Sequence, residues 1–156
     1  MIVGGPKKAL KTSMLIDMAV SLGLGEGVYF LNDYRFRVEK RVAVGVYSGE
    51  SGAATIAATT RCVCAAKNRK PAETAVYWCF ATPRLSNESD LAAIRAFIKR
   101  RNLKVVVFDP VYLSLLKGNA KASAASVFDM GEVLGKITNQ RITITCRNEV
   151  RLGWQW

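Results

Sequence analysis

The sequence contains no histidine, and this absence excludes several kinds of catalytic and metal site. Serine-histidine and cysteine-histidine nucleophile pairs cannot form, and neither can a zinc site of mixed cysteine and histidine ligands. Only two of the four cysteines are close together, and the single residue between them is poor spacing for zinc. We therefore expect buried free thiols at Cys62, Cys64, Cys79 and Cys146.

Long hydrophobic runs are also absent. No stretch approaches the ~20 apolar residues that span a bilayer, and Lys7, Lys8 and Lys11 lie too close to the first glycines for a signal peptide. The 156 residues, half of them apolar, can bury the core of one domain and leave no length for a second. We expect a single soluble, cytoplasmic domain over residues 1–156.

Acidic residues are scarce relative to basic ones. Twenty-three Lys and Arg stand against twelve Asp and Glu, so the formal charge is +11. This excess favours polyanionic partners, although the clusters are spread along the chain and no interleaved aromatics indicate a platform for single-strand stacking. The clusters are Arg35/Arg37/Lys40/Arg41, Lys67/Arg69/Lys70 and Lys99/Arg100/Arg101/Lys104.

What the chain does contain is a phosphate-binding loop near its start. Residues 5–12 match the pattern GxxxxGK[ST] except that Leu10 replaces the second glycine. In such a loop backbone N–H groups surround the phosphates, the lysine reaches the β and γ groups, and the hydroxyl binds Mg²⁺. Because a side chain restricts positive φ values, Leu10 leaves open how closely its backbone approaches a phosphate. The predicted nucleotide-binding residues are Gly5, Pro6, Lys7, Lys8, Ala9, Leu10, Lys11, Thr12 and Ser13.

The segments after this loop alternate between strand and helix patterns. Strands are predicted at 1–3, 42–47, 75–80, 104–108 and 141–146, and helices from about 14 to 22, at 53–66, at 90–101 and near 127–137. An aromatic stretch at 28–36 is expected to form a short excursion or hairpin. Strands that alternate with helices predict an α/β fold, a mostly parallel sheet flanked by helices with right-handed crossovers.

Two carboxylates follow strands of this sheet. Asp109 ends the apolar strand 104–108 and is predicted to bind Mg²⁺ together with Thr12, because open α/β sheets place ligands at the carboxyl ends of their strands. Glu50 follows the strand 42–47 between Gly49 and Gly52, and is predicted to orient or deprotonate the attacking water.

Four segments in this order, GGPKKALKTS, YSGESG, PRLSN and VVVFDPVYL, resemble RecA-like P-loop ATPases, and most of all bacterial AAA-family ATPases related to the RepA-type replicative helicases. The resemblance covers residues 1–135. It implies that ATP and Mg²⁺ are the cofactors, that Lys11 and Thr12 hold them, that Glu50 activates water and that Asp109 is the second-motif acid. It also implies a homo-oligomeric ring with a basic residue acting in trans, and single- or double-stranded DNA contacted by loops such as 116–125.

The chain departs from this pattern at both ends. Only residues 1–3 precede the loop, and the resemblance fades over 136–156, so we expect a sheet incomplete at both ends and a divergent or truncated tail. The leading hypothesis is an ATP-binding ATPase domain that is coupled to DNA and is of the replication, helicase or recombination type. The alternatives are a catalytically impaired nucleic-acid-binding fragment of the same fold, a non-functional remnant, and a small-molecule phosphotransferase.

Overall fold

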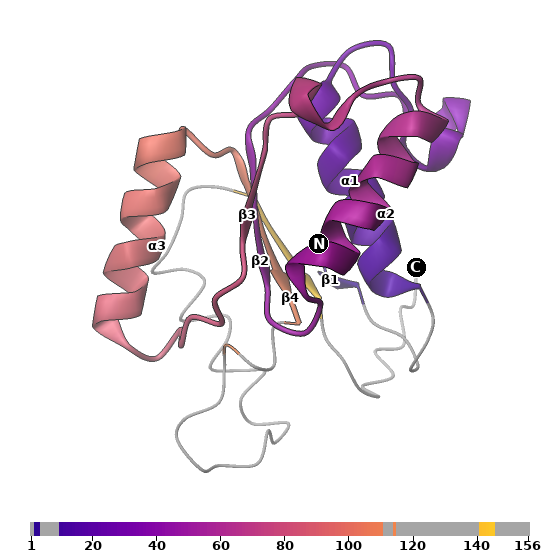
Figure 1. Cartoon of the computed structure of the whole chain (residues 1–156). Helices are drawn as coiled ribbons and strands as arrows, with labels where there is room; N and C mark the ends of the chain where they lie inside the picture. The colour runs from indigo at the N-terminus through magenta and orange to yellow at the C-terminus, as the bar shows by residue number, and fades with distance from the viewer. Residues whose placement is uncertain (1, 4–9, 111–113, 115–140, 146–156) are drawn as a thin grey trace, which may run out of the picture.

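The computed structural model describes residues 2, 3, 10–110, 114 and 141–145, and these form an α/β fold with helices on both faces of a sheet (Figure 1). The helices are α1 (Lys11–Leu24), α2 (Ala53–Ala66) and α3 (Glu88–Arg101). The strands are β1 (Ile2–Val3), β2 (Val44–Ser48), β3 (Val76–Cys79), β4 (Val105–Asp109) and β5 (Arg141–Thr145). The predicted α/β fold with a parallel sheet flanked by helices is confirmed.

All strand pairs of the sheet are parallel, and the spatial order is β1-β5-β4-β2-β3. The last strand in sequence, β5, lies between β1 and β4, and Ile2 is in register with Ile144. In the middle of the sheet Ser48 is in register with Asp109. Because every pair is parallel, the carboxyl ends of the strands lie at one edge, which is also where α1 and α2 begin (Figure 1).

The two faces of the sheet pack against different helices. On one face Leu15 and Ala19 of α1 contact Val44 and Val46 of β2 and Val107 of β4. The alternate strand residues point the other way, as the side-chain period of two requires. On that second face the core includes Leu91, Ile94 and Ile98 of α3 with Tyr47, Val106 and Phe108.

The helix ends follow local signals in the sequence. Gly25, at φ +87°, caps α1. Gly23 lies inside the helix, and only glycine fits there without a shift, because a Cβ would come within 2.7 Å of the Val76 side chain. The Asn87 side chain caps α3 by accepting hydrogen bonds from the backbone N–H groups of Ser89 and Asp90. Asn102 ends α3 in the left-handed conformation that asparagine tolerates.

The predicted excursion after α1 consists of 3-10 turns at Phe30–Asn32 and Tyr34–Phe36, closed by an antiparallel bridge between Tyr29 and Arg37. A further 3-10 turn, Pro71–Glu73, precedes β3. Lys67, at the end of α2, holds the excursion in place. Its ammonium donates to the Tyr29 carbonyl at 2.8 Å and to Asn32 Oδ1 at 2.9 Å, and it pairs with Asp17 of α1 at 3.0 Å.

Three predictions fall outside the described residues: the helix near 127–137, the loop 116–125 and most of the tail 136–156. Within that tail the predicted strand at 141–146 is confirmed as β5. No helix in the described part of the chain has the length and apolar character needed to cross a bilayer.

Candidate nucleotide site

The sheet brings the start of α1, Glu50 and Asp109 to the same edge. Asp109 is the last residue of β4, and its carbonyl accepts a hydrogen bond from the Gly49 N–H at 2.8 Å. Glu50 is the next residue along the chain and is exposed in the loop before α2. The backbone of this loop is therefore tied directly to the end of the strand that carries Asp109.

The alternation of β2 and β4 assigns their last residues to the α1 face. In β4, Val105 and Val107 pack on the α1 side, and Asp109 continues this row at the carboxyl end. In β2, Val46 lies on the same side, and Ser48 continues its row. Ser48 and Asp109 are therefore register neighbours whose side chains face the helix that begins at Lys11.

The predicted phosphate loop is described only from Leu10 onward, since Gly5 to Ala9 lie outside the described residues. Leu10 adopts a left-handed conformation, φ 54° and ψ 21°, and is 75% exposed. Its carbonyl accepts from the Met14 N–H at 2.9 Å, so Leu10 is the residue immediately before the first helical turn. The leucine thus takes a backbone conformation that glycine adopts without strain.

The first turn of α1 suits an anion. Leu10 supplies no side-chain cap, and the turn contains no acidic residue. The N–H groups at a helix start lack partners within the helix and carry a partial positive charge. Lys11 and Thr12 are half-buried in this turn, and Ser13 is exposed. A phosphate group could be held here by both the helix dipole and a lysine.

A residue that the sequence reasoning missed is Ser48. Its side chain is 3% exposed, and Oγ has no hydrogen-bond partner in the part of the chain that the structure describes. A buried hydroxyl without a partner costs ~1–3 kcal/mol. The signal was present in the sequence, because a serine ends an otherwise apolar strand two residues before Glu50. Its position beside Asp109 makes it a candidate for contacting a bound ligand.

The basic clusters are partly structural. Lys67 belongs to the second cluster, yet its side chain is 2% exposed, and its ammonium pairs with Asp17 and donates hydrogen bonds to the excursion. It therefore cannot serve a lid over a phosphotransferase acceptor. In the first cluster Arg41 donates to the carbonyls of Gly23 and Glu73, both at 3.0 Å. The third cluster, at the end of α3, remains on the surface.

The cysteine prediction is only partly right. Cys64 is buried, and burial raises the pKa of its thiol, whereas Cys79 is half-buried and Cys62 is exposed. Cys62 lies on the outward side of α2, since Ile56, Thr60 and Cys64 take the buried positions of that helix. The prediction of a buried thiol at Cys62 is wrong, and Cys146 lies outside the described residues. The described residues contain no cluster of three metal-ligating side chains of the His, Cys, Asp or Glu type.

In a comparison with protein families, a family described as an AAA domain matches residues 1–146. The matched range contains the predicted phosphate loop, Glu50, Asp109 and β5. No curated protein matches the chain.

Proposed function

Because the chain belongs to the AAA domain family, we propose that it binds ATP and Mg²⁺ at the carboxyl edge of the sheet and hydrolyses the nucleotide there. Membership of this family indicates a nucleotide-binding ATPase. The proposal goes further in naming the residues. The loop from Gly5 to Ser13 surrounds the phosphates, Lys11 contacts the β and γ groups, and Thr12 and Asp109 hold Mg²⁺.

The observation that carries this proposal is the placement of Ser48 and Asp109. They are register neighbours at the carboxyl edge, in rows that face α1, the helix whose first residues complete the phosphate-loop pattern. A carboxylate and hydroxyls are the hard oxygen donors that Mg²⁺ prefers. Ser48 Oγ is buried and has no hydrogen-bond partner among the described residues, which fits a site whose missing partner is a ligand or its ordered water.

Within this proposal each group has a separate task. Lys11 and the helix start neutralise phosphate charge and fix its position, which is most of what catalysis of phosphoryl transfer requires. Mg²⁺ supplies further charge neutralisation when it is bound. Glu50, in the exposed loop tied to Asp109, orients the attacking water and accepts its proton.

The finer grouping, with RepA-type replicative helicases, belongs to the same proposal. A charge of +11 supports contact with single- or double-stranded DNA. We propose that the domain acts in a homo-oligomeric ring in which a neighbouring subunit supplies a cation to the nucleotide.

Nucleotide binding is tested by titration calorimetry with ATP and Mg²⁺. Lys11→Ala should abolish the binding heat, because the charge opposite the phosphates is lost. Lys40→Ala is the matched control, since Lys40 is an exposed lysine between the excursion and β2. Equal heats for wild type and Lys11→Ala would refute the assignment of the loop.

Hydrolysis and DNA coupling need separate measurements. Glu50→Gln should lower ATP turnover by on the order of 10²–10⁴-fold, as the loss of a general base does, while Glu26→Gln, at an exposed turn, should not change it. Turnover that rises with DNA favours the DNA-coupled ATPase over a small-molecule phosphotransferase. Affinity for single-stranded DNA should fall steeply with salt, and a flat response would exclude phosphate contacts. DNA affinity without any turnover would favour the impaired binding fragment.

A further inference from the structure

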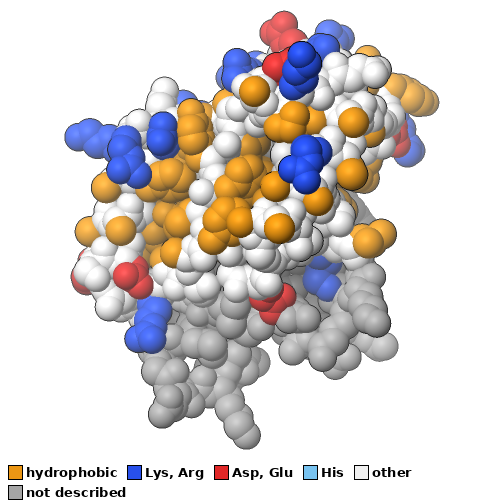
Figure 2. Space-filling model, viewed as in Figure 1, with side chains coloured by type: hydrophobic (Ala, Val, Ile, Leu, Met, Phe, Trp, Pro, Cys, Tyr) orange, Lys and Arg blue, Asp and Glu red, His pale blue; other side chains and the backbone are white. Residues whose placement is uncertain are grey.

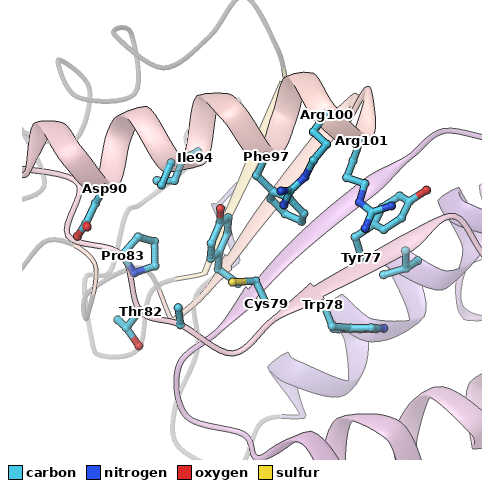
Figure 3. Close-up of a pocket in the computed structure, with 14 residues that line it drawn as sticks. Tyr77, Trp78, Cys79, Thr82, Pro83, Asp90, Ile94, Phe97, Arg100 and Arg101 are labelled. Atoms are coloured by element: carbon cyan, nitrogen blue, oxygen red, sulfur yellow. The ribbon is translucent and has the colours of Figure 1, made fainter.

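A cavity of about 730 Å³ opens between β3 and α3 (Figure 3). This is within the ~300–1,000 Å³ typical of ligand pockets. It lies on the α3 face of the sheet, whereas the proposed nucleotide site faces α1. Among the described strands, β3 is an edge strand that pairs only with β2. The cavity therefore adjoins a strand whose outer backbone edge has no partner in the described sheet.

The walls of this cavity are mainly apolar and only half covered. Ile94 and Phe97 project from α3 toward the strand that carries Tyr77 and Cys79 (Figure 3). Tyr77, Cys79 and Phe97 are all half-buried. In Figure 2 hydrophobic side chains gather over β3, in the space between α3 and α2. Apolar surface beside an unpaired strand edge is typical of a site for another polypeptide.

The two ends of the cavity carry opposite charge. Arg100 and Arg101 reach it from the last turn of α3, and the Arg101 guanidinium lies 4.8 Å from the centre of the Tyr77 ring. At the other end lies Asp90, whose carboxylate accepts from the Arg84 N–H at 2.7 Å. Figure 3 shows this separation of Asp90 from the two arginines along α3. An occupant should therefore have an acidic end and an end without acidic residues.

We propose that the edge of β3 and this cavity bind an extended, apolar segment of a partner protein that carries acidic residues at the end facing Arg100 and Arg101. Its backbone would pair with β3 and alternate side chains would enter the cavity, as in strand-addition complexes. From Asp90 to Arg101 the helix rises about 16 Å at ~1.5 Å per residue. That length corresponds to roughly five residues of extended chain at ~3.3 Å each.

Two other occupants fit these features less well. A second copy of the chain would bring another +11 of formal charge toward the two arginines, so the proposed ring is expected to form through a different face. A nucleic acid carries a negative charge at every nucleotide, yet the cations are confined to one end and Asp90 at the other end repels phosphate. An acidic tip on an otherwise apolar segment matches both ends.

The probe is a short synthetic peptide of alternating valine and phenylalanine with two glutamates at one end. Its binding is followed by the alkylation rate of Cys79, which lines the cavity, read by mass spectrometry on the full chain. Cys62, exposed on α2 and outside the cavity, is the internal control. We expect saturable, several-fold slower alkylation of Cys79 with no change at Cys62. Unchanged Cys79 alkylation at millimolar peptide would overturn the proposal.

Charge reversal tests the polarity. The double variant Arg100→Glu, Arg101→Glu should bind the glutamate peptide at least tenfold more weakly than the wild type does. A peptide with lysines in place of the glutamates should bind the variant at least tenfold more tightly than it binds the wild type. Equal affinity of both peptides for wild type and variant would show that the arginines do not select the occupant. A thermal melt checks that the variant is folded.

Filling the cavity provides a second, independent test. Ala93 lines it and Ala92 does not, although both are exposed on α3. Ala93→Trp should block the glutamate peptide, and Ala92→Trp should leave its binding unchanged. If sedimentation instead shows a wild-type dimer that Ala93→Trp disrupts, the cavity is an interface between copies of this chain and the partner proposal is wrong.

Discussion

Leu10 offers a quantitative test of the phosphate-loop geometry, through its replacement by glycine and by alanine. At φ 54° a residue with a Cβ is strained by ~1–2 kcal/mol. Alanine keeps this strain and glycine removes it, but glycine also loses roughly 0.5–1 kcal/mol through its greater freedom in the unfolded chain. We therefore expect Leu10→Gly to be more stable than Leu10→Ala by about 0.5–1 kcal/mol.

The leucine side chain itself contributes little to this comparison. It is 75% exposed, so about a quarter of the ~1.5–3 kcal/mol for full burial, roughly 0.5 kcal/mol, is lost in either variant. Leu10→Gly should thus have nearly wild-type stability, whereas Leu10→Ala should be destabilised. At this chain length 1 kcal/mol corresponds to ~2–4 °C in Tm.

The assay is urea unfolding of the three proteins without nucleotide, together with a control at an ordinary helical position. Ala92→Gly, exposed within α3, should lower the free energy of unfolding by roughly 0.5–1 kcal/mol. Alanine should therefore give the higher free energy of unfolding at position 92, and glycine should give the higher value at position 10. If glycine is the less stable residue at position 10 as well, the left-handed conformation of Leu10 does not exist in solution.

Three further predictions concern buried groups. Ser48→Ala should raise the free energy of unfolding by ~1 kcal/mol without nucleotide, because it removes a buried hydroxyl that has no partner among the described residues. This gain should vanish at saturating ATP and Mg²⁺. A loss of stability in the absence of nucleotide would mean that Ser48 already has a partner. Lys67→Met should cost about 3 kcal/mol in urea unfolding, since it leaves the Asp17 carboxylate without its buried ion pair; a cost below 1 kcal/mol would mean that water replaces the ammonium. Burial raises the pKa of Tyr47 from 10.0 to about 12, so the folded state holds this proton more tightly and loses stability as the pH rises from 10 to 12. Tyr47→Phe should show a smaller fall over that range, and parallel pH profiles would contradict the pKa shift.

Most of the fold could be predicted from local pattern. The helix at 53–66 is found with the predicted bounds as α2, and the strand at 75–80 is found as β3 with one residue fewer at each end. These elements are marked by glycine or by polar breaks in apolar periodicity, which act within a few residues. The order of the strands could not be predicted, because it depends on pairing between residues 2–3 and 141–145.

The placement of the candidate residues could be predicted where strand ends define it. Asp109 and Glu50 follow apolar strands, so the parallel sheet necessarily brings their backbones to one edge. The burial of Lys67 could not be predicted, since its partners Asp17, Tyr29 and Asn32 lie on other elements. The groove between β3 and α3 left no local signal either, because its two walls are separate segments of the chain.

The position of β5 also determines the order in which the described sheet can be completed during synthesis. Among the described strands β1, which precedes the predicted phosphate loop, is made first, yet its partner in the described sheet is β5, the last of these strands in the sequence. While the chain emerges, β2, β3 and β4 can pair with one another as soon as each is available. β1 joins the described sheet only after residues 141–145 are available, whereas α1 packs directly on β2 and β4. A nascent chain shorter than this can therefore place α1 on the sheet while β1 is still without its strand partner in the described sheet.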